Sequence, residues 1–400
     1  MRMLPDITGL SQSKPAQPSA PGHQQHSTGS ASMWQQLLVS PFAGRIDAID
    51  PDVCAALDRV SLGATFFGSL AWFALLARTA MVPHAQAQYL VLWKNDGSEP
   101  MCMPFLRKVA GVTRRTEALS NFYSCLFEPV ARATASHELA IEFSRFLQRT
   151  QPGTDVVDLR PLDAQSAFFR EMRQALAGNG FWTDTYFCFG NWYLELAGQD
   201  FAAYFQTRPS QLRNTWRRAR KKLEQRSLDI EIVSENSDRL DVAIANYEAI
   251  YNSSWKHPEP FPDFIPGMCR MAADRGWLRL GVLSLEGKAV AAQIWFVKDG
   301  IASIFKLAYI EEYAKQSVGT VLTAELMRHT IDDDKVGVVD YLSGDDAYKK
   351  DWMNHRRERL GIIAFNKRRP LGVLAAARHF GARMLKAWRP PRATRPAVTA

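Results

Sequence analysis

The sequence lacks most of the features that mark several common protein classes. Its 400 residues include only five cysteines, which are scattered, odd in number and form no CxxC pair. This usage argues against a disulfide framework or a zinc knuckle and suits a reducing compartment. No GxSxG elbow, dinucleotide fingerprint or metal-binding His/Cys pattern occurs either, so no metal is expected. The N-terminus shows no signal-peptide pattern, and we therefore expect a cytoplasmic protein.

Long apolar runs are also scarce. Only residues 62–82 approach the roughly 20 apolar residues that a membrane span requires. Arg78 lies inside this run, and glycine, serine and threonine dilute it. We therefore expect a buried core helix here, with a membrane span as the alternative.

The composition of the whole chain, with 46% hydrophobic and 22% charged residues, is that of a globular protein. Four hundred residues fit two domains of ordinary size. Residues 1–33 are rich in Ser, Gln, Pro, His and Gly, so we expect them to be disordered. The predicted organisation after them is a first domain at 34–205, a second at 206–370, and a basic helix and tail at 371–400.

The formal net charge of +8 is unevenly distributed. Residues 207–226 hold eight basic residues and one acidic residue, and the chain after Glu358 has ten basic residues and no acidic one. Two basic patches on an otherwise acidic protein suggest an anionic partner.

Each basic patch has two interpretations. Residues 210–226 predict a helix with one apolar stripe, either a docked helix with a solvated basic face or a cradle for phosphates or RNA. Residues 371–388 predict a basic amphipathic helix, which could lie on an anionic membrane surface or cap the domain. For residues 210–226 the sequence favours the docked helix. For residues 371–388 it leaves both interpretations open.

The second half has a clear predicted order of elements. Three apolar runs at 278–310, separated by turns at 286–288 and 298–300, predict an antiparallel meander. A loop at 311–317, a helix at 318–333 and strands at 336–342 and 359–366 follow. The first half predicts a similar mixture, including a hairpin whose turn is Asn95-Asp96-Gly97.

The loop before the predicted helix at 318–333 offers a binding site for phosphate. Small hydroxyl residues and a glycine at a helix N-terminus leave backbone N–H groups and the positive end of the dipole facing an anion. We therefore take five residues as the candidate cofactor-binding loop: Gln316, Ser317, Val318, Gly319 and Thr320.

This order of elements resembles the GNAT superfamily, and within it the branch of FemAB-type and CelD-type (cellulose-biosynthesis) acyltransferases. Residues 317–322, 344–349 and 119–123 carry the likeness. The resemblance implies an α/β (α+β) fold of tandem GNAT-like domains, each a mixed, mostly antiparallel sheet flanked by helices. The first domain would be degenerate and the second active.

The resemblance also implies a site. GNAT enzymes bind the pyrophosphate of an acyl-CoA co-substrate at the loop that matches Gln316–Thr320, although only Gly319 remains here of its glycine-rich signature. The strand at 301–309 would separate from its neighbour at a bulge and present backbone N–H groups to the thioester carbonyl. Tyr348 falls where many GNAT enzymes protonate the leaving thiolate, and Lys349 where FemAB-type proteins stabilise negative charge.

Direct acyl transfer also needs a base for the attacking group. Glu311, Asp345 and Asp346 are the candidates, and repulsion between the two adjacent aspartates could raise the pKa of one of them. Trp255 and Lys256 are candidates for binding the acceptor substrate, although a tryptophan here is also typical of a packed core.

The sequence thus predicts an acyltransferase that moves an acyl group from acyl-CoA to an amine or hydroxyl of a sugar, glycan precursor or lipid. One alternative keeps the fold and takes the acyl group from aminoacyl-tRNA, as FemAB-type proteins do. The other is a non-catalytic scaffold of a polysaccharide synthesis complex, bound peripherally to a membrane.

Overall fold

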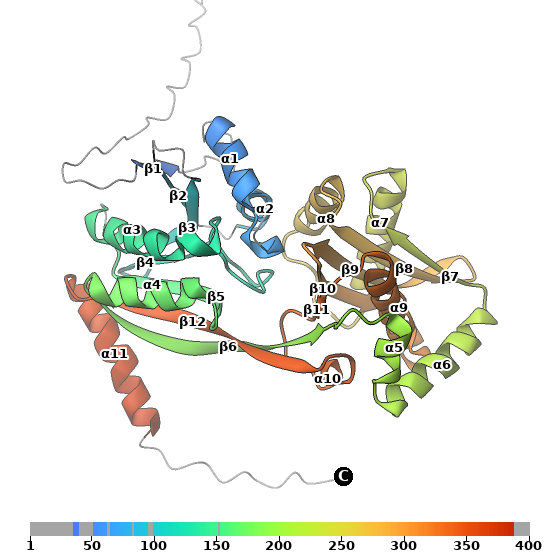
Figure 1. Ribbon diagram of the computed structural model, residues 1–400. Coiled ribbons are helices and arrows are strands. Elements are labelled where there is room, and N and C mark those ends of the chain that lie inside the picture. Colours follow the sequence, from blue (N-terminus) through green and yellow to red (C-terminus); the bar gives the residue numbers. More distant parts are fainter. Residues whose placement is uncertain are drawn as a thin grey trace, which may run out of the picture.

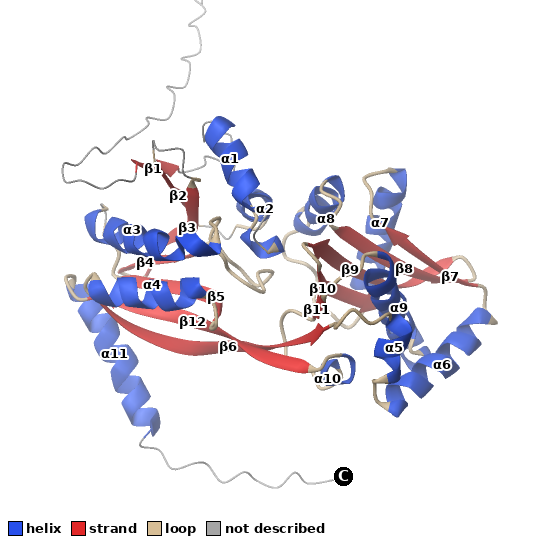
Figure 2. Cartoon of the chain, in the orientation of Figure 1, coloured by secondary structure: helices blue, strands red, loops and turns tan. Residues whose placement is uncertain are grey.

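The computed structural model describes residues 35–39, 51–61, 65–81, 84–94, 99–150 and 153–387. The predicted disordered segment at 1–33, the Asn95-Asp96-Gly97 turn and the tail after 387 lie outside the described residues. The described strands form one twelve-stranded sheet with helices on both sides (Figures 1 and 2). Its order is β1-β2-β3-β4-β5-β12-β6-β11-β10-β9-β8-β7.

The first half contains an antiparallel meander, a helix and a strand parallel to the last meander strand. These are β2 (Gln86–Trp93), β3 (Met101–Ala110), β4 (Thr113–Ala118), α3 (Ser136–Arg149) and β5 (Val156–Asp163). The remaining elements are β1 (Gln35–Val39), α1 (Pro51–Ser61), η3 (Phe66–Gly68), α2 (Leu70–Thr79), η4 (Ala133–Ala135), α4 (Ala167–Gly178) and β6 (Phe181–Glu195).

The second half repeats this pattern. Its meander, helix and parallel strand are β8 (Leu278–Leu285), β9 (Lys288–Lys298), β10 (Ile301–Tyr309), α9 (Val318–Arg328) and β11 (Val338–Asp340). Before them come α5 (Phe201–Gln206), α6 (Ser210–Glu224), β7 (Leu228–Val233), α7 (Asp238–Asn252) and α8 (Phe264–Asp274). The remaining described elements are the 3-10 helix η5 (Glu311–Gln316), the π-helix η6 (His329–Asp333), α10 (Lys349–Trp352), β12 (His355–Asn366) and α11 (Pro370–Ala387). The repeat matches the expected tandem GNAT-like architecture.

The halves exchange their last strands. β6 follows β5 in the chain but pairs with β11 of the second half, whereas β12 follows β11 but pairs with β5 of the first half. β6 and β12 then pair with each other along most of their length, and they are the long strands along the lower edge of Figure 1. The two halves are therefore joined through the centre of one sheet.

Burial on both faces of the sheet explains the apolar run in β9. Ala292, Ile294 and Phe296 pack in a core that α7, α8 and the whole first half share. Ala291 and Trp295, which point to the other face, pack in a second core with α6 and α9. A strand covered on both faces has little need for polar alternation.

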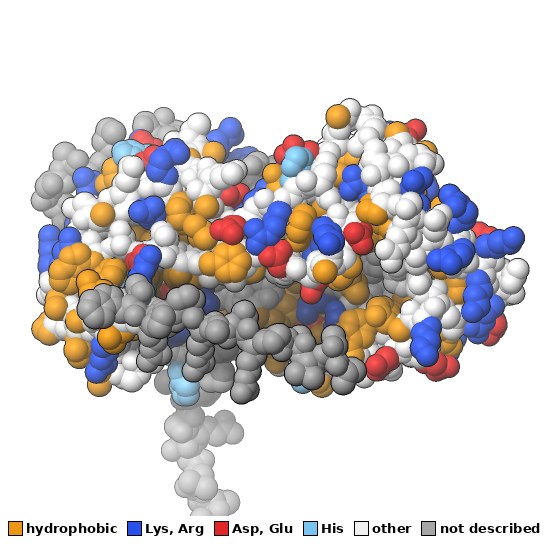
Figure 3. All heavy atoms as spheres, turned by 90° about the horizontal axis from the view of Figure 1, so that it is seen from below, with side chains coloured by type: hydrophobic (Ala, Val, Ile, Leu, Met, Phe, Trp, Pro, Cys, Tyr) orange, Lys and Arg blue, Asp and Glu red, His pale blue; other side chains and the backbone are white. Residues whose placement is uncertain are grey.

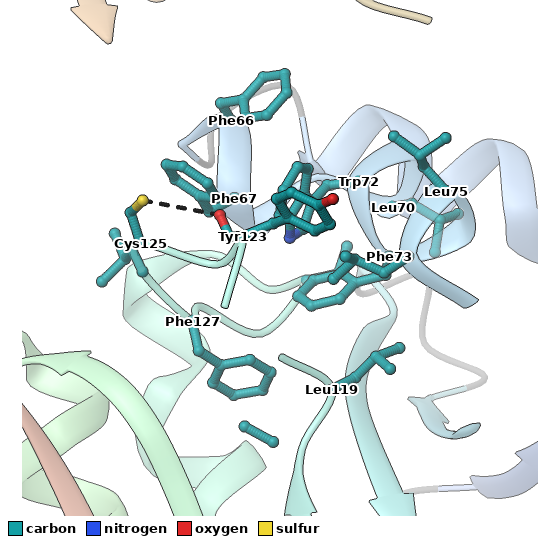
Figure 4. Packing of buried hydrophobic residues seen from close by; sticks show 14 of the residues in the cluster. Phe66, Phe67, Leu70, Trp72, Phe73, Leu75, Leu119, Tyr123, Cys125 and Phe127 are labelled. Carbon is teal, nitrogen blue, oxygen red and sulfur yellow. Dashed lines mark hydrogen bonds between the residues drawn. The ribbon is translucent and has the colours of Figure 1, made fainter. Parts of the chain in front are cut away.

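The apolar run at 62–82 forms the short turn η3 and the ten-residue helix α2, which confirms the expected core helix. Trp72 and Phe73 are fully buried, and Phe66 stacks on Phe296 of the second half with ring centroids 4.0 Å apart. Figure 4 shows part of this cluster, in which Phe66, Phe67, Trp72 and Phe73 are labelled. No helix in the described part of the chain is long and apolar enough to cross a membrane.

Several predicted boundaries were wrong. Residues 311–316, predicted as a loop, form a 3-10 helix because successive i to i+3 hydrogen bonds close there. The predicted strand at 359–366 begins earlier, at His355, because its first residues pair with β6. None of the described cysteines forms a disulfide.

Candidate active site

The site is built around a fork between two parallel strands. β10 and β11 pair only from Ile301 to Ser303, opposite Val338–Asp340. A bulge then interrupts the pairing of β10 with β9 between Ile304 and Lys306. Beyond the bulge, no described strand pairs with the edge of β10 that faces β11. The expected separation of the strand at 301–309 from its neighbour is therefore present.

The hydrogen-bond pattern shows which backbone groups face this open edge. In an antiparallel pair, every second residue directs its N–H and C=O away from the partner strand. Ile310 N donates to Val290 O at 2.9 Å, which fixes the alternation. In the same register Leu307, opposite Gln293, and Tyr309 direct their N–H groups to the open edge.

The side chain of Lys256 lies at the same edge. Its Nζ donates a hydrogen bond to the Leu307 carbonyl, and it lies over the rings of Trp255 and Tyr251. Burial, and next the neighbouring charge of Lys306, lower the pKa of Lys256 to about 8. This amine is therefore partly neutral slightly above neutral pH.

The N-terminus of α9 faces the fork. Ser317 has a left-handed backbone (φ 57°) and does not cap the helix with its side chain. Gln293 of β9 fixes the first turn, since its Nε2 donates to Gly319 O at 3.2 Å and to Thr323 Oγ1 at 2.7 Å. The first N–H groups of α9 are therefore held in place with the positive end of its dipole.

A pocket of about 260 Å³ lies between these elements. It is lined by Trp255, Gln293, Leu307, Tyr309, Ala314, Ser317, Val318, Gly319, Thr320, Thr323, Tyr341, Tyr348 and Trp352. Four of the five predicted cofactor-loop residues line this pocket, together with Tyr348 and Trp255.

Tyr348 lines the pocket. It precedes α10 and packs edge-on against Tyr341, with ring centroids 5.8 Å apart. Burial and the charge of Asp346 raise the pKa of Tyr348 to about 12. Its hydroxyl therefore stays protonated at neutral pH and can donate a proton or a hydrogen bond.

Lys349 does not line the pocket. The residue is buried, and its Nζ donates to the carbonyls of Ser343 and Gly344 and lies 3.3 Å from Asp346 Oδ2. Asp346 itself is exposed. In this arrangement Lys349 holds the 343–346 loop that orients Tyr348.

Asp345 points away from the pocket, toward the strands β6 and β12. Arg356 binds both carboxylate oxygens, with its Nη2 2.6 Å from Oδ2, and Trp192 Nε1 donates to Oδ1 at 2.8 Å. The hydrogen bond from Arg356 lowers the pKa of Asp345. The expectation that repulsion raises the pKa is therefore wrong for this residue, because Arg356 of the following strand, β12, neutralises it.

Two further candidates also lie outside the pocket lining. Glu311 is exposed on η5, and Gln316 accepts a hydrogen bond from Arg226 Nη1 at 2.9 Å through its side-chain oxygen. Among the described residues, no group of His, Cys, Asp and Glu could hold a metal ion.

The first half reaches the fork through Tyr123. Its hydroxyl donates to Glu259 Oε2, and the other carboxylate oxygen of Glu259 lies 2.6 Å from Lys306 Nζ, at the bulge. Burial and the bond to Glu259 raise the pKa of Tyr123. The 119–123 motif thus fixes the first half to the strand that carries the open edge.

Sequence reasoning missed several pocket residues. Gln293 lies on β9, Thr323 on α9 and Tyr341 directly after β11, so they meet only in the folded chain. Gln293 carried one usable signal, because it is the single polar residue in the apolar run from Ala289 to Val297. A buried polar side chain of this kind requires partners.

Comparisons with known proteins bear on this geometry. Residues 210–350, which contain the fork and the pocket loop, match the family model described as Acetyltransferase (GNAT) domain. The match lies entirely within the second half of the chain and its helix α6. No curated protein matches the sequence.

Solved structures extend the likeness over both halves. The crystal structure of FemX is similar with a TM-score of 0.58 and 11% identity, covering 81% of this chain and 97% of FemX. The C-terminal domain of a putative lysylphosphatidylglycerol synthetase from Agrobacterium fabrum is similar with a TM-score of 0.50 and 14% identity. The match covers 84% of this chain and 96% of that domain. L-PGS from Bacillus licheniformis has a TM-score of 0.50 and 13% identity, and the match covers 82% of this chain and 95% of L-PGS. At these identities the likeness shows the fold alone, shared over more than four fifths of this chain.

Proposed function

We propose that the protein is an acyltransferase that moves an acyl group from an acyl-CoA to an amine or hydroxyl of a sugar, glycan precursor or lipid. The observation that carries the proposal is the pocket in which the N-terminus of α9, the open edge of β10 and the Tyr348 hydroxyl meet. A helix N-terminus suits a pyrophosphate, and free N–H groups on a strand edge suit a thioester carbonyl.

The residues present fit such a donor. An acyl-CoA would supply an acyl group activated as a thioester. The first turn of α9, at Ser317–Thr320, would hold its pyrophosphate, and the Leu307 N–H would bind the carbonyl oxygen. Of the glycine-rich loop that the resemblance implies, only Gly319 remains. This glycine lies close to the Tyr309 ring, since a Cβ added there would be 3.3 Å from the ring carbon Cδ1.

Transfer would occur by direct attack, without an acylated enzyme. The acceptor nitrogen or oxygen bonds to the carbonyl carbon, the carbon–sulfur bond breaks, and Tyr348 gives its proton to the departing sulfur. Of the predicted carboxylates, Asp346 is the one whose charge acts on Tyr348, and it is proposed as the base that takes the proton of the attacking group. Lys349 would stabilise developing negative charge through the loop it holds, and Trp255 and Lys256 would contact the acceptor.

A thermal-shift screen against acetyl-CoA, longer acyl-CoAs, free CoA and charged tRNA tests the donor. A ligand that binds only the folded protein raises the melting temperature. We expect a shift with an acyl-CoA that is lost in Gly319→Leu, because the new side chain fills the pocket. Gly178→Leu is the matched control, since nothing lies within 4 Å of its added Cβ. No shift with any CoA would reject this donor class.

The alternative donor is aminoacyl-tRNA, which the resemblance to FemAB-type proteins implies. The supporting observation is α6, whose apolar residues are packed in the second core while Arg217, Arg218, Lys221 and Lys222 are exposed. Binding of charged tRNA that weakens steeply with salt would favour this version.

The partners of the proposed reaction are a small-molecule, glycan or lipid acceptor and an anionic membrane surface reached through residues 371–388. A non-catalytic scaffold of a polysaccharide synthesis complex would share the membrane surface but bind neither CoA nor tRNA.

A further inference from the structure

One face of α11 is docked on the sheet. Ala376 is buried against Val156 and Phe365, and the Phe380 ring lies 5.8 Å from that of Phe365. Gly372 allows the helix to begin in backbone contact with β12, since a Cβ there would lie 2.4 Å from Asn366 O. This inner face caps the first half, as one of the two sequence interpretations predicted.

The helix is also held by charge. His379 Nε2 lies 2.8 Å from Asp184 Oδ2 on β6, and Arg383 donates to the same oxygen. These contacts fix the rotation of α11 about its axis, so the opposite face must point outward.

The outward face of α11 is apolar and exposed. Val373, Leu374, Met384 and Leu385 are 40%, 46%, 71% and 69% exposed. At 1.5 Å per residue they extend over about 18 Å of the helix. Among the other described helices, only α7 exposes a large hydrophobic side chain, Val242. Four such side chains on one helix face are therefore unusual for the surface of this protein.

The charges around this stripe are of one sign. Arg378 is exposed on the helix beside the stripe, Lys367 and Arg368 are exposed just before the helix begins, and the chain contains no acidic residue after Glu358. The carboxylate beside the helix, Asp184, is already bound by Arg383 and His379. On the face seen from below, hydrophobic side chains gather at the left, where α11 lies, with Lys and Arg among them (Figure 3).

An aromatic residue adjoins the helix. Trp182 is two positions before Asp184 in β6, so both side chains point to the face that α11 covers. Trp182 is 41% exposed, and Lys367 Nζ lies 5.7 Å from its ring centroid. An amphipathic aromatic beside a basic residue suits the boundary between lipid headgroups and chains.

We propose that the outer face of α11 docks the protein on an anionic lipid surface. The four apolar side chains enter the boundary between headgroups and acyl chains, while the surrounding basic residues bind the headgroups. A second copy of the chain fits less well, because a symmetric contact would bring two faces of the same charge together. This inference extends the membrane part of the proposed function and does not depend on the transfer reaction.

Flotation of the full-length protein with vesicles tests the proposal. We expect binding to vesicles that contain phosphatidylglycerol and little binding to pure phosphatidylcholine. Leu374→Glu combined with Leu385→Glu should weaken binding at least about tenfold, because both carboxylates face the lipid. The control is Val109→Glu with Val112→Glu, two valines 67% and 73% exposed in the β3–β4 hairpin, which should leave binding unchanged.

Circular dichroism and the melting temperature establish that both double variants fold. Equal vesicle binding by the wild type and the α11 variant would overturn the proposal, as would equal binding to neutral and anionic vesicles. So would a wild-type dimer that the α11 variant converts to a monomer in light scattering. None of these readouts uses CoA or tRNA, so a failure here is separable from a failure of the proposed reaction.

Discussion

At the scale of single residues, the environment of Lys256 gives a testable titration. Because burial and Lys306 lower its pKa, we expect Lys256 to titrate at about 8, well below an ordinary lysine. Removing the repelling charge in Lys306→Met should raise this pKa, whereas removing the attracting carboxylate in Glu259→Gln should lower it further. NMR of the reductively methylated protein, with Lys256→Arg for assignment, measures all three. A titration near 10.5 would contradict the burial of this amine.

Tyr348 carries the second prediction at this scale. Once a donor and acceptor are known, Tyr348→Phe should lower kcat by about 10²–10⁴-fold and leave donor binding intact, because only proton donation is lost. With a pKa of about 12, the hydroxyl should not impose a loss of activity with rising pH below about 10. An unchanged kcat, also in a Tyr348→Phe and Lys349→Ala double variant, would remove both residues from the proposed mechanism.

The residues of the site differ in how far sequence could predict them. Ser317–Thr320 and Tyr348 line one pocket, and each belongs to a short contiguous motif that the sequence shows; their roles stay predictions. The partners of Asp345 could not be predicted, since Trp192 and Arg356 come from two strands that meet only through the exchange of β6 and β12. Long-range contacts of this kind leave no local pattern.

At the scale of elements, two glycines of α11 make a matched pair. Gly372→Ala should destabilise the protein by about 1–3 kcal/mol, because its Cβ would meet the backbone of Asn366 and Asp155. Gly381→Ala should instead stabilise by up to about 1 kcal/mol, since nothing lies within 4 Å and alanine favours helix. Thermal unfolding measures both, and equal effects would show that α11 is not packed on β12.

Most elements could be predicted because their patterns are local. The meander of β8, β9 and β10 follows from three apolar runs and two tight turns, and α9 from its N-terminal signal and apolar periodicity. The early start of β12 at His355 could not be predicted. Its first residues, His355 to Glu358, are polar, and they form a strand only because β6 supplies hydrogen-bond partners.

At the scale of the whole molecule, the exchange of β6 and β12 decides how the chain can be divided. The predicted domain boundary at 205 and 206 stays a prediction, and cutting there tests it. Residues 34–205 alone would lack β12 between β5 and β6, so we expect this fragment to be insoluble or unfolded alone. Co-expression with 206–400 should restore a soluble complex. Independent folding of the first fragment would show that the shared sheet is dispensable.

The same exchange has a consequence for synthesis on the ribosome. β12 is made after β7 to β11 of the second half, yet it fills the position between β5 and β6 at the centre of the sheet. Until that segment leaves the ribosome, β5 has an edge without its final partner, and such edges can pair with other chains. Completion of the fold must therefore wait until β12 has been made, and chaperones that shield strand edges should matter most in that interval.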